Sequence, residues 1–224
     1  MRFNKVKEQL VLLLLLCLTT KASSQFEVGR KLIGLTIQNT YNEEFKYTGL
    51  YSTKTTIDKS NLFAIGGGYF VRNNLSLDLS LISYSAENEI IEPGDIQRIN
   101  LSGIGFYLGS RVYAQSENRF RFFANPGFSF LPNSGKFSQY SNGNLSSSGK
   151  IESLALVLGV GGGFTYMVNK HFGLDISIGN LGGYNYSLNK LTQDGEVIFQ
   201  TQKSGFEINP ITAGSFTFGI NYFF

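Results

Sequence analysis

The sequence predicts an all-β fold, and three observations support this prediction. Apolar and polar residues alternate with a period of two through most of the chain, which is the period of a β-strand. The 224 residues include 26 Gly, 20 Phe and 12 Tyr, whereas charged residues make up only 16%. Beyond the N-terminal segment, no apolar run is long enough for a membrane helix.

The clearest strand is 75–81, where Leu occupies every odd position and Ser or Asp every even one. The same alternation recurs in 103–109, 172–179 and 215–224. Eight segments of this kind are expected to form strands. They are 26–41, 60–71, 74–86, 97–114, 119–130, 151–168, 172–188 and 206–224.

Short and long connections alternate between these eight strands. The short ones are polar turns at 71–74, 115–118 and 169–171. The long ones are 42–56, 87–96, 132–150 and 189–205, and the last contains an Asp194-Gly195 hairpin signal that would prolong strands seven and eight. An even set of antiparallel strands with short turns at one end and long loops at the other is typical of an outer-membrane barrel. The sequence therefore predicts an eight-stranded antiparallel up-and-down transmembrane β-barrel.

A secreted β-sandwich or a lipocalin-like barrel is the alternative, and it would bury its apolar phase. The other phase carries Gly, Ser, Thr and charged residues, so a soluble protein would lack a core on that side. Aromatic residues also gather near the strand ends, as in the two interfacial girdles of membrane barrels. They are Tyr69, Phe120, Phe122, Phe172, Tyr222 and Phe224 toward the short turns, and Phe128, Phe130, Tyr184 and Tyr186 toward the long loops. This arrangement favours an outward-facing apolar surface.

The N-terminus has the features of a cleaved signal peptide. Three basic residues within 2–7 precede the apolar run 11–18, and the small residues 22–24 follow. The run is too short for a membrane helix. A lipoprotein signal ending at Cys17 is a further alternative, but Leu16 stands where such sites need a small residue. We expect a signal peptide at 1–24 and a barrel domain at 25–224.

Removal of this segment changes the charge balance. The chain has a formal charge of +3, and cleavage after residue 24 would leave 15 basic and 15 acidic residues. The basic surface of a nucleic-acid-binding protein is therefore not expected. The only Cys would leave with the signal, and His171 is the only His, so neither a disulfide nor a Cys/His metal centre is expected. We expect no metal or cofactor.

Two motifs resemble a known family. The run 63–77, FAIGGGYFVRNNLSL, is similar to a strand–turn–strand segment of small Bacteroidetes-type outer-membrane β-barrel proteins, often called porin-family, whose usual form is GYFV-x-DNLA-x-G. Asn73 replaces the commonest Asp, and Asp78 occupies a typically uncharged position. The closing run 217–224, TFGINYFF, is similar to the family's terminal strand.

The resemblance implies a location in the outer membrane of a Gram-negative cell envelope, with short turns in the periplasm and long loops outside. It also implies that the barrel-assembly machinery reads the C-terminal aromatics, for which Phe218, Tyr222 and Phe224 are the candidates. It implies no reaction.

Glycines are frequent on the predicted inner face. They are Gly66, Gly68, Gly103, Gly105, Gly109, Gly159, Gly161 and Gly163. An eight-stranded barrel is just wide enough to be filled by side chains, so a wide pore is not expected. The glycines are interpreted as relieving crowding beside bulky residues such as Tyr107, with a small lumenal cavity as the alternative.

Four charged residues occupy the same phase. Asp78, Arg111 and Asp175 each lie four positions from a short turn, and Arg121 lies near the same level. Because a buried charge is costly unless it is paired, we expect an ion-pair network that fills the lumen. A proton or ion relay through the same residues is the alternative.

These features favour a non-enzymatic barrel with a structural or surface-interaction role. A Ser–His hydrolase site near the outer leaflet is disfavoured because His171 is expected in a periplasmic turn, as a solvated residue. Carboxylates in the long loops (Glu43, Glu44, Glu87, Glu89 and Glu92) are interpreted as solvating groups, although a carboxylate mechanism stays open. The expected partners are outer-membrane lipid, the assembly machinery and an extracellular partner of the loops. The alternative function is a narrow solute channel or a component of a transport or secretion complex.

Overall fold

The structure is a computed structural model, and it describes residues 26–47, 53–114, 119–208 and 216–224. All regular elements in these residues are antiparallel strands. They are β1 (Lys31–Tyr47), β2 (Thr53–Arg72), β3 (Leu75–Glu92), β4 (Asp95–Tyr113), β5 (Phe120–Ser141), β6 (Asn144–Met167), β7 (Phe172–Gln193), β8 (Glu196–Ile208) and β9 (Phe216–Phe223). No helix in this part of the chain is long and apolar enough to cross a membrane. The prediction of an all-β antiparallel fold is confirmed.

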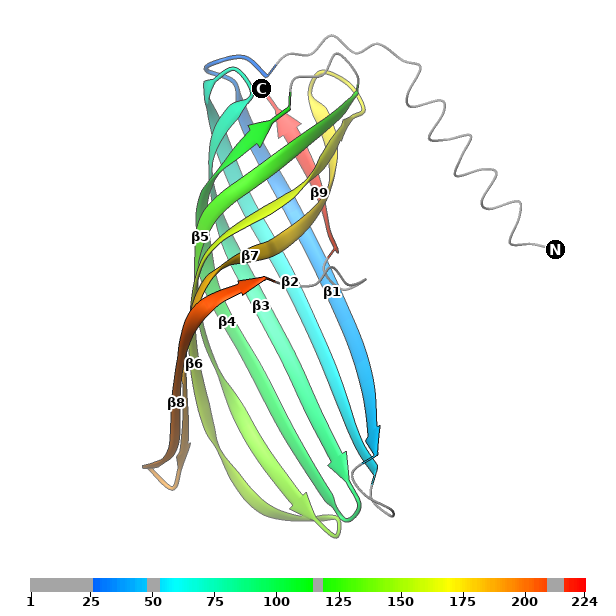
Figure 1. Ribbon diagram of the computed structural model, residues 1–224, viewed down its shortest axis with the longest axis vertical. Coiled ribbons are helices and arrows are strands. Elements are labelled where there is room, and N and C mark those ends of the chain that lie inside the picture. Colours follow the sequence, from blue (N-terminus) through cyan, green and yellow to red (C-terminus); the bar gives the residue numbers. More distant parts are fainter. Residues whose placement is uncertain (1–25, 48–52, 115–118, 209–215) are drawn as a thin grey trace, which may run out of the picture.

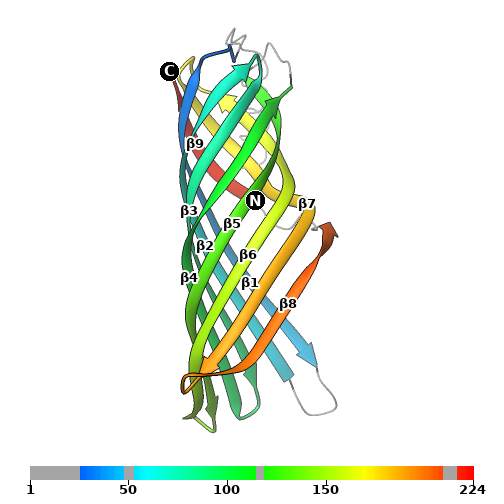
Figure 2. The same ribbon diagram turned by 90° about the vertical axis from the view of Figure 1, so that its left-hand side faces the viewer.

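The strands form a tall barrel that closes at one end (Figures 1 and 2). Strands β1 to β7 pair in sequence order, and β9 closes the ring by pairing with β1 on one side and β7 on the other. Among the described residues, β8 pairs only with the distal part of β7, Gly182 to Gln193. We call the end of the barrel where β2, β4 and β6 end the closed end, and the end where β3, β5 and β7 end the distal end.

The predicted strand count and boundaries differ from those observed. The described residues contain nine strands instead of eight, because the predicted last strand 206–224 corresponds to the end of β8 and to β9. Residues 209–215 between them, and the predicted signal peptide, lie outside the described residues. The first strand begins at Lys31, five residues later than expected, because 26–30 turn into the base of the barrel.

The long connections are mostly strand. Segments 87–96, 132–150 and 189–205 form hairpins whose tight turns centre on Gly94, Asn142-Gly143 and Asp194-Gly195. These turn residues have positive φ angles of 86°, 51° and 81°, and 51° and 85°, which glycine and short polar residues accept most readily. Only the Asp194-Gly195 extension was predicted. The others were missed because their few apolar residues do not alternate regularly with polar ones.

The predicted orientation of the two faces is confirmed. On β3, Leu77, Leu79 and Leu81 point outward and are 53–60% exposed, whereas Ser76 and Asp78 point inward and are buried. β2 to β7 have 18–24 residues each, but about 9–11 residues are enough to cross the hydrocarbon of a bilayer. Most outward apolar residues lie in the half nearest the closed end, and the distal half of β2 to β5 presents mainly polar side chains outward. Leu145 and β8 residues such as Val197 and Phe199 are exceptions near the distal end.

The hydrophobic core lies inside the closed end. It consists of Phe26, Leu32, Phe70, Tyr113, Phe123, Met167 and Phe223. These residues come from the N-terminal turn and from strands all around the ring, so the base of the barrel is filled with apolar side chains.

Candidate functional site

The candidate site is a charged layer that spans the interior above this core. Arg111 on β4 lies between two carboxylates: its Nε is 3.3 Å from Asp78 Oδ2 on β3, and its Nη1 is 2.6 Å from Asp175 Oδ2 on β7. Ser76 donates a 2.7 Å hydrogen bond to the other oxygen of Asp78. Because β4 and β7 are not neighbours in the sheet, the Arg111–Asp175 pair reaches across the lumen.

Three of the four predicted network residues therefore meet. The fourth, Arg121 on β5, is buried, and its guanidinium carbon lies 5.7 Å from the centre of the Phe26 ring. The Arg111 guanidinium lies 4.6 Å from the centre of the Phe123 ring. Cation–π contacts of this kind connect the charged layer to the aromatic core below it.

Phe26 is the central residue of that core, and sequence reasoning missed its role. Its ring is fully buried, and its centre lies 4.3 Å from the Tyr113 ring, 5.0 Å from Phe70 and 5.1 Å from Phe223. Its carbonyl accepts a hydrogen bond from Asn74 N at 2.9 Å. A sequence signal for this layer existed, because Phe70, Tyr113 and Phe223 are aromatic residues in the inward polar phase close to the closed end.

A packed layer around Tyr107 lies next to the charged residues. The Tyr107 hydroxyl donates to Pro126 O at 3.3 Å, and its ring lies over Gly109 and Gly127. A Cβ atom on either glycine would overlap this ring, and one on Gly68 would overlap the Asp78 carboxylate. These contacts favour the interpretation that inner glycines relieve crowding.

The distal half of the interior is less filled. A cavity of about 800 Å³ lies along the inner side of β6, β7 and β8, where Asn185, Ser187, Lys203 and Glu207 line it. Asn185 Nδ2 donates a 2.6 Å hydrogen bond to Glu207. The barrel thus combines a packed base with a polar distal cavity.

The C-terminal strand places its candidate assembly residues on the outside. Phe218, Tyr222 and Phe224 are 54%, 38% and 57% exposed, whereas Phe223 points inward. His171 lies beside this strand, with Nδ1 2.8 Å from Phe223 O and its ring stacked on Tyr222. His171 lies in the turn between β6 and β7, as predicted, but it is partly buried because Phe223 and Tyr222 cover one side of its ring.

An antiparallel barrel that closes at one end, with an apolar outer belt and a charged, side-chain-filled base, fits the architecture of outer-membrane barrels. The family model for the outer membrane protein beta-barrel domain matches residues 10–224. The chain belongs to this family.

Two solved structures are distantly similar. The outer membrane protein OprG of Pseudomonas aeruginosa has 12% sequence identity and a TM-score of 0.41, over 88% of this chain and 97% of that one. Ail, the attachment invasion locus protein of Yersinia pestis, has 16% identity and a TM-score of 0.36, over 88% of this chain and 99% of that one. No match was found among curated proteins.

Proposed function

We propose that the chain is a non-enzymatic integral outer-membrane barrel that is closed at its periplasmic base and acts through its distal surface. The observation that carries the proposal is the filled base, where the Asp78–Arg111–Asp175 layer lies directly over the Phe26 core. Because the charged and aromatic layers fill the base with side chains, we expect them to block solutes there. Such a barrel anchors a surface and does not conduct.

The proposal includes the finer topology. β8 and β9 act together as the eighth strand, a signal peptide at 1–24 is removed on export, and the short turns face the periplasm. The assembly machinery would read the outward aromatics Phe218, Tyr222 and Phe224. The resemblance of 63–77 to Bacteroidetes-type porin-family barrels supports this assignment, and that origin stays a prediction.

The distal hairpins are the proposed contact surface for an extracellular partner. They extend the barrel wall beyond the apolar belt as paired strands, so their side chains are held in fixed positions. Cross-strand ion pairs stabilise the surface: Arg98 Nε lies 2.8 Å from Glu89 Oε1, and Lys54 Nζ lies 3.3 Å from Glu92 Oε1. A rigid polar surface favours specific docking because little entropy is lost on binding.

The absence of enzymatic activity is part of the proposal. His171 lies at the closed end, with its Nδ1 2.8 Å from Phe223 O, at the opposite end of the barrel from Glu87 and Glu89. Glu87 and Glu89 lie on β3, and each carboxylate faces a cation: Glu87 faces Lys59, and Glu89 faces Arg98. Ion pairing of this kind supports a structural role for these groups.

Planar-bilayer conductance of the purified, refolded chain tests the proposal. We expect no sustained single-channel current, together with heat-modifiable migration on a gel, which reports a folded barrel. Persistent open-channel current would contradict the closed barrel and favour the alternative, a narrow solute channel. The distal cavity of about 800 Å³ would then be its entry chamber.

A further inference from the structure

A polar pocket lies on the outer surface of β2 to β5, immediately beyond the apolar belt. Its volume is about 390 Å³, within the range of small-molecule sites. It belongs neither to the charged layer in the lumen nor to the tips of the distal hairpins.

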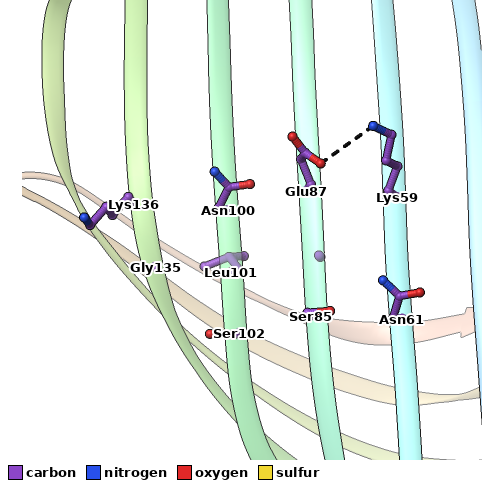
Figure 3. A pocket seen from close by; sticks show the side chains of 10 residues that line it. Lys59, Asn61, Ser85, Glu87, Asn100, Leu101, Ser102, Gly135 and Lys136 are labelled. Atoms are coloured by element: carbon purple, nitrogen blue, oxygen red, sulfur yellow. Dashed lines mark ion pairs between the residues drawn. The ribbon is translucent and has the colours of Figure 1, made fainter.

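Two rows of outward side chains build this pocket. The row nearest the belt runs in register through Asn61, Ser85, Ser102 and Ser134. The next row runs through Lys59, Glu87, Asn100 and Lys136. Short side chains thus form the floor, and long charged ones form the distal rim. Figure 3 shows Lys136 and Lys59 on either side, with Asn100 and Glu87 between them.

Apolar side chains border the floor on the side of the closed end. Phe63, Leu81 and Ile104 are exposed there, and the Phe106 and Phe130 rings pack 5.5 Å apart between their centres. A molecule seated in the pocket would therefore meet polar groups at one end and an apolar wall at the other. This arrangement suits the headgroup and acyl chains of a membrane lipid.

The charges on the rim favour an anionic group. Lys136 is directly opposite Lys150 on β6, and like charges in opposite positions of neighbouring strands destabilise a sheet. Lys150 Nζ is 2.5 Å from Glu152 Oε1, and this hydrogen bond lowers the pKa of the Glu152 carboxyl. Among the described residues, Lys136 has no such carboxylate. A phosphate near Lys136 would supply the missing negative charge.

The remaining groups favour a sugar. Glu87 faces Lys59, with 3.7 Å between Oε2 and Nζ, and its carboxylate retains acceptor capacity for hydroxyl groups. Asn100 offers both a donor and an acceptor beside it, and Asn61, whose Oδ1 already accepts a hydrogen bond from Asn39 Nδ2, offers its Nδ2 as a donor. A carboxylate would repel a headgroup that is only anionic, whereas it binds one that also carries hydroxyls.

We propose that this pocket binds the phosphorylated sugar headgroup of a membrane glycolipid, an inference that rests on the proposed insertion of the belt in the outer membrane. Lys136 contacts the phosphate, and Glu87, Asn61 and Asn100 contact sugar hydroxyls. The acyl chains lie on the apolar wall below.

The test uses the full mature chain in phosphatidylcholine nanodiscs, with lipid binding measured by native mass spectrometry. The probes are an acylated glucosamine-disaccharide phosphate, the same glycolipid without phosphate, phosphatidylglycerol and soluble glucosamine phosphate. We expect the phosphorylated glycolipid to bind most tightly. Lys136→Gln should weaken it about tenfold, the typical effect of losing one charge-assisted hydrogen bond. The same substitution should leave the unphosphorylated glycolipid unchanged.

Lys190→Gln is the matched control. Lys190 pairs with Glu152, which pairs with Ser134, so Lys190 lies at nearly the same level as Lys136. It is on β7, two strands away from Lys136 on β5 and outside the pocket. An equal loss with Lys190→Gln, or equal binding of phosphatidylglycerol, would overturn the site. Equal affinity for soluble glucosamine phosphate would show that the pocket recognises a free sugar phosphate and not the headgroup of a lipid. A heat-modifiable barrel in nanodiscs without selective binding defeats only this inference, whereas failure to insert defeats the proposed function as well.

Discussion

At the scale of single residues, the positive charge of Arg111 offsets the negative charges of two carboxylates inside the barrel. Its guanidinium faces both Asp78 and Asp175, so its removal would leave two like charges in a poorly hydrated interior. Breaking a buried ion pair on one side costs more than replacing the whole group, because the remaining charge keeps its desolvation penalty.

Arg111→Ala should therefore lower the free energy of unfolding by ~3–5 kcal/mol. The measurement is urea titration in detergent micelles, followed by circular dichroism and by heat-modifiable gel migration. Arg111→Met combined with Asp78→Asn and Asp175→Asn should cost less than Arg111→Ala alone. Unchanged heat resistance of Arg111→Ala would show that the charged layer does not stabilise the base.

Phe26 gives a second prediction at this scale. Phe26→Ala should remove a fully buried ring and cost ~3–5 kcal/mol, because neighbours on different strands cannot all move inward to fill the space. Val28→Ala is the control: Val28 is exposed on the same turn, and its change should stay within ~0.5 kcal/mol. Equal effects of the two substitutions in the urea titration would contradict the role of Phe26 as the centre of the core.

At the scale of strands, glycines on β4 and β5 decide where large side chains fit. The Tyr107 ring occupies the space over Gly109 on its own strand and Gly127 on the neighbouring one. The sequence shows only that glycines repeat in the inward phase. Which side chain fills the space depends on the register between strands.

Gly109→Ala should cost ~1–3 kcal/mol, because its new methyl group would force Tyr107 out of its position. Adding Tyr107→Leu should make the combined loss smaller than the sum of the two single losses, which a double-mutant cycle measures. Gly205→Ala on β8 is the control, because no atom lies within 4 Å of its added Cβ. Strictly additive losses would argue against the contact.

At the scale of the whole molecule, the outer surface divides into an apolar belt near the closed end and a polar distal half. On β3 the division falls between Leu81 and Ser83, and on β2 between Phe63 and Asn61. Phe63 pairs with Ser83, so the boundary on β2 lies one outward residue nearer the distal end than the boundary on β3. The boundary marks the expected level of the membrane surface.

Leu79→Lys tests this position of the membrane. Leu79 lies outward near the middle of the belt, where a Lys costs ~2–4 kcal/mol. Ser148→Lys, on the exposed distal half of β6, should change stability by less than ~0.5 kcal/mol. Refolding yield and urea titration in lipid vesicles measure both. A small loss at Leu79 would place the bilayer elsewhere on the barrel.

Some features of the fold could be predicted from the sequence and others could not, for physical reasons. Alternation located the strands and the outward face, as at 75–81, because burial imposes a strict two-residue period. Counting from the short turns placed Asp78, Arg111 and Asp175 at a common depth. In the hairpins beyond Leu81 the few apolar residues do not alternate regularly with polar ones, and only the Asp194-Gly195 signal indicated that strand continues there.

The sequence by itself determined the β-architecture, the outward apolar belt, the family and the level of the charged layer, since each depends on local order along the chain. The tertiary structure alone decided that Arg111 reaches Asp175 across the lumen and that Phe26 fills the base. It also set Lys136 opposite Lys150 beside a polar pocket. These contacts join residues far apart in sequence, and barrel closure and strand register bring them together.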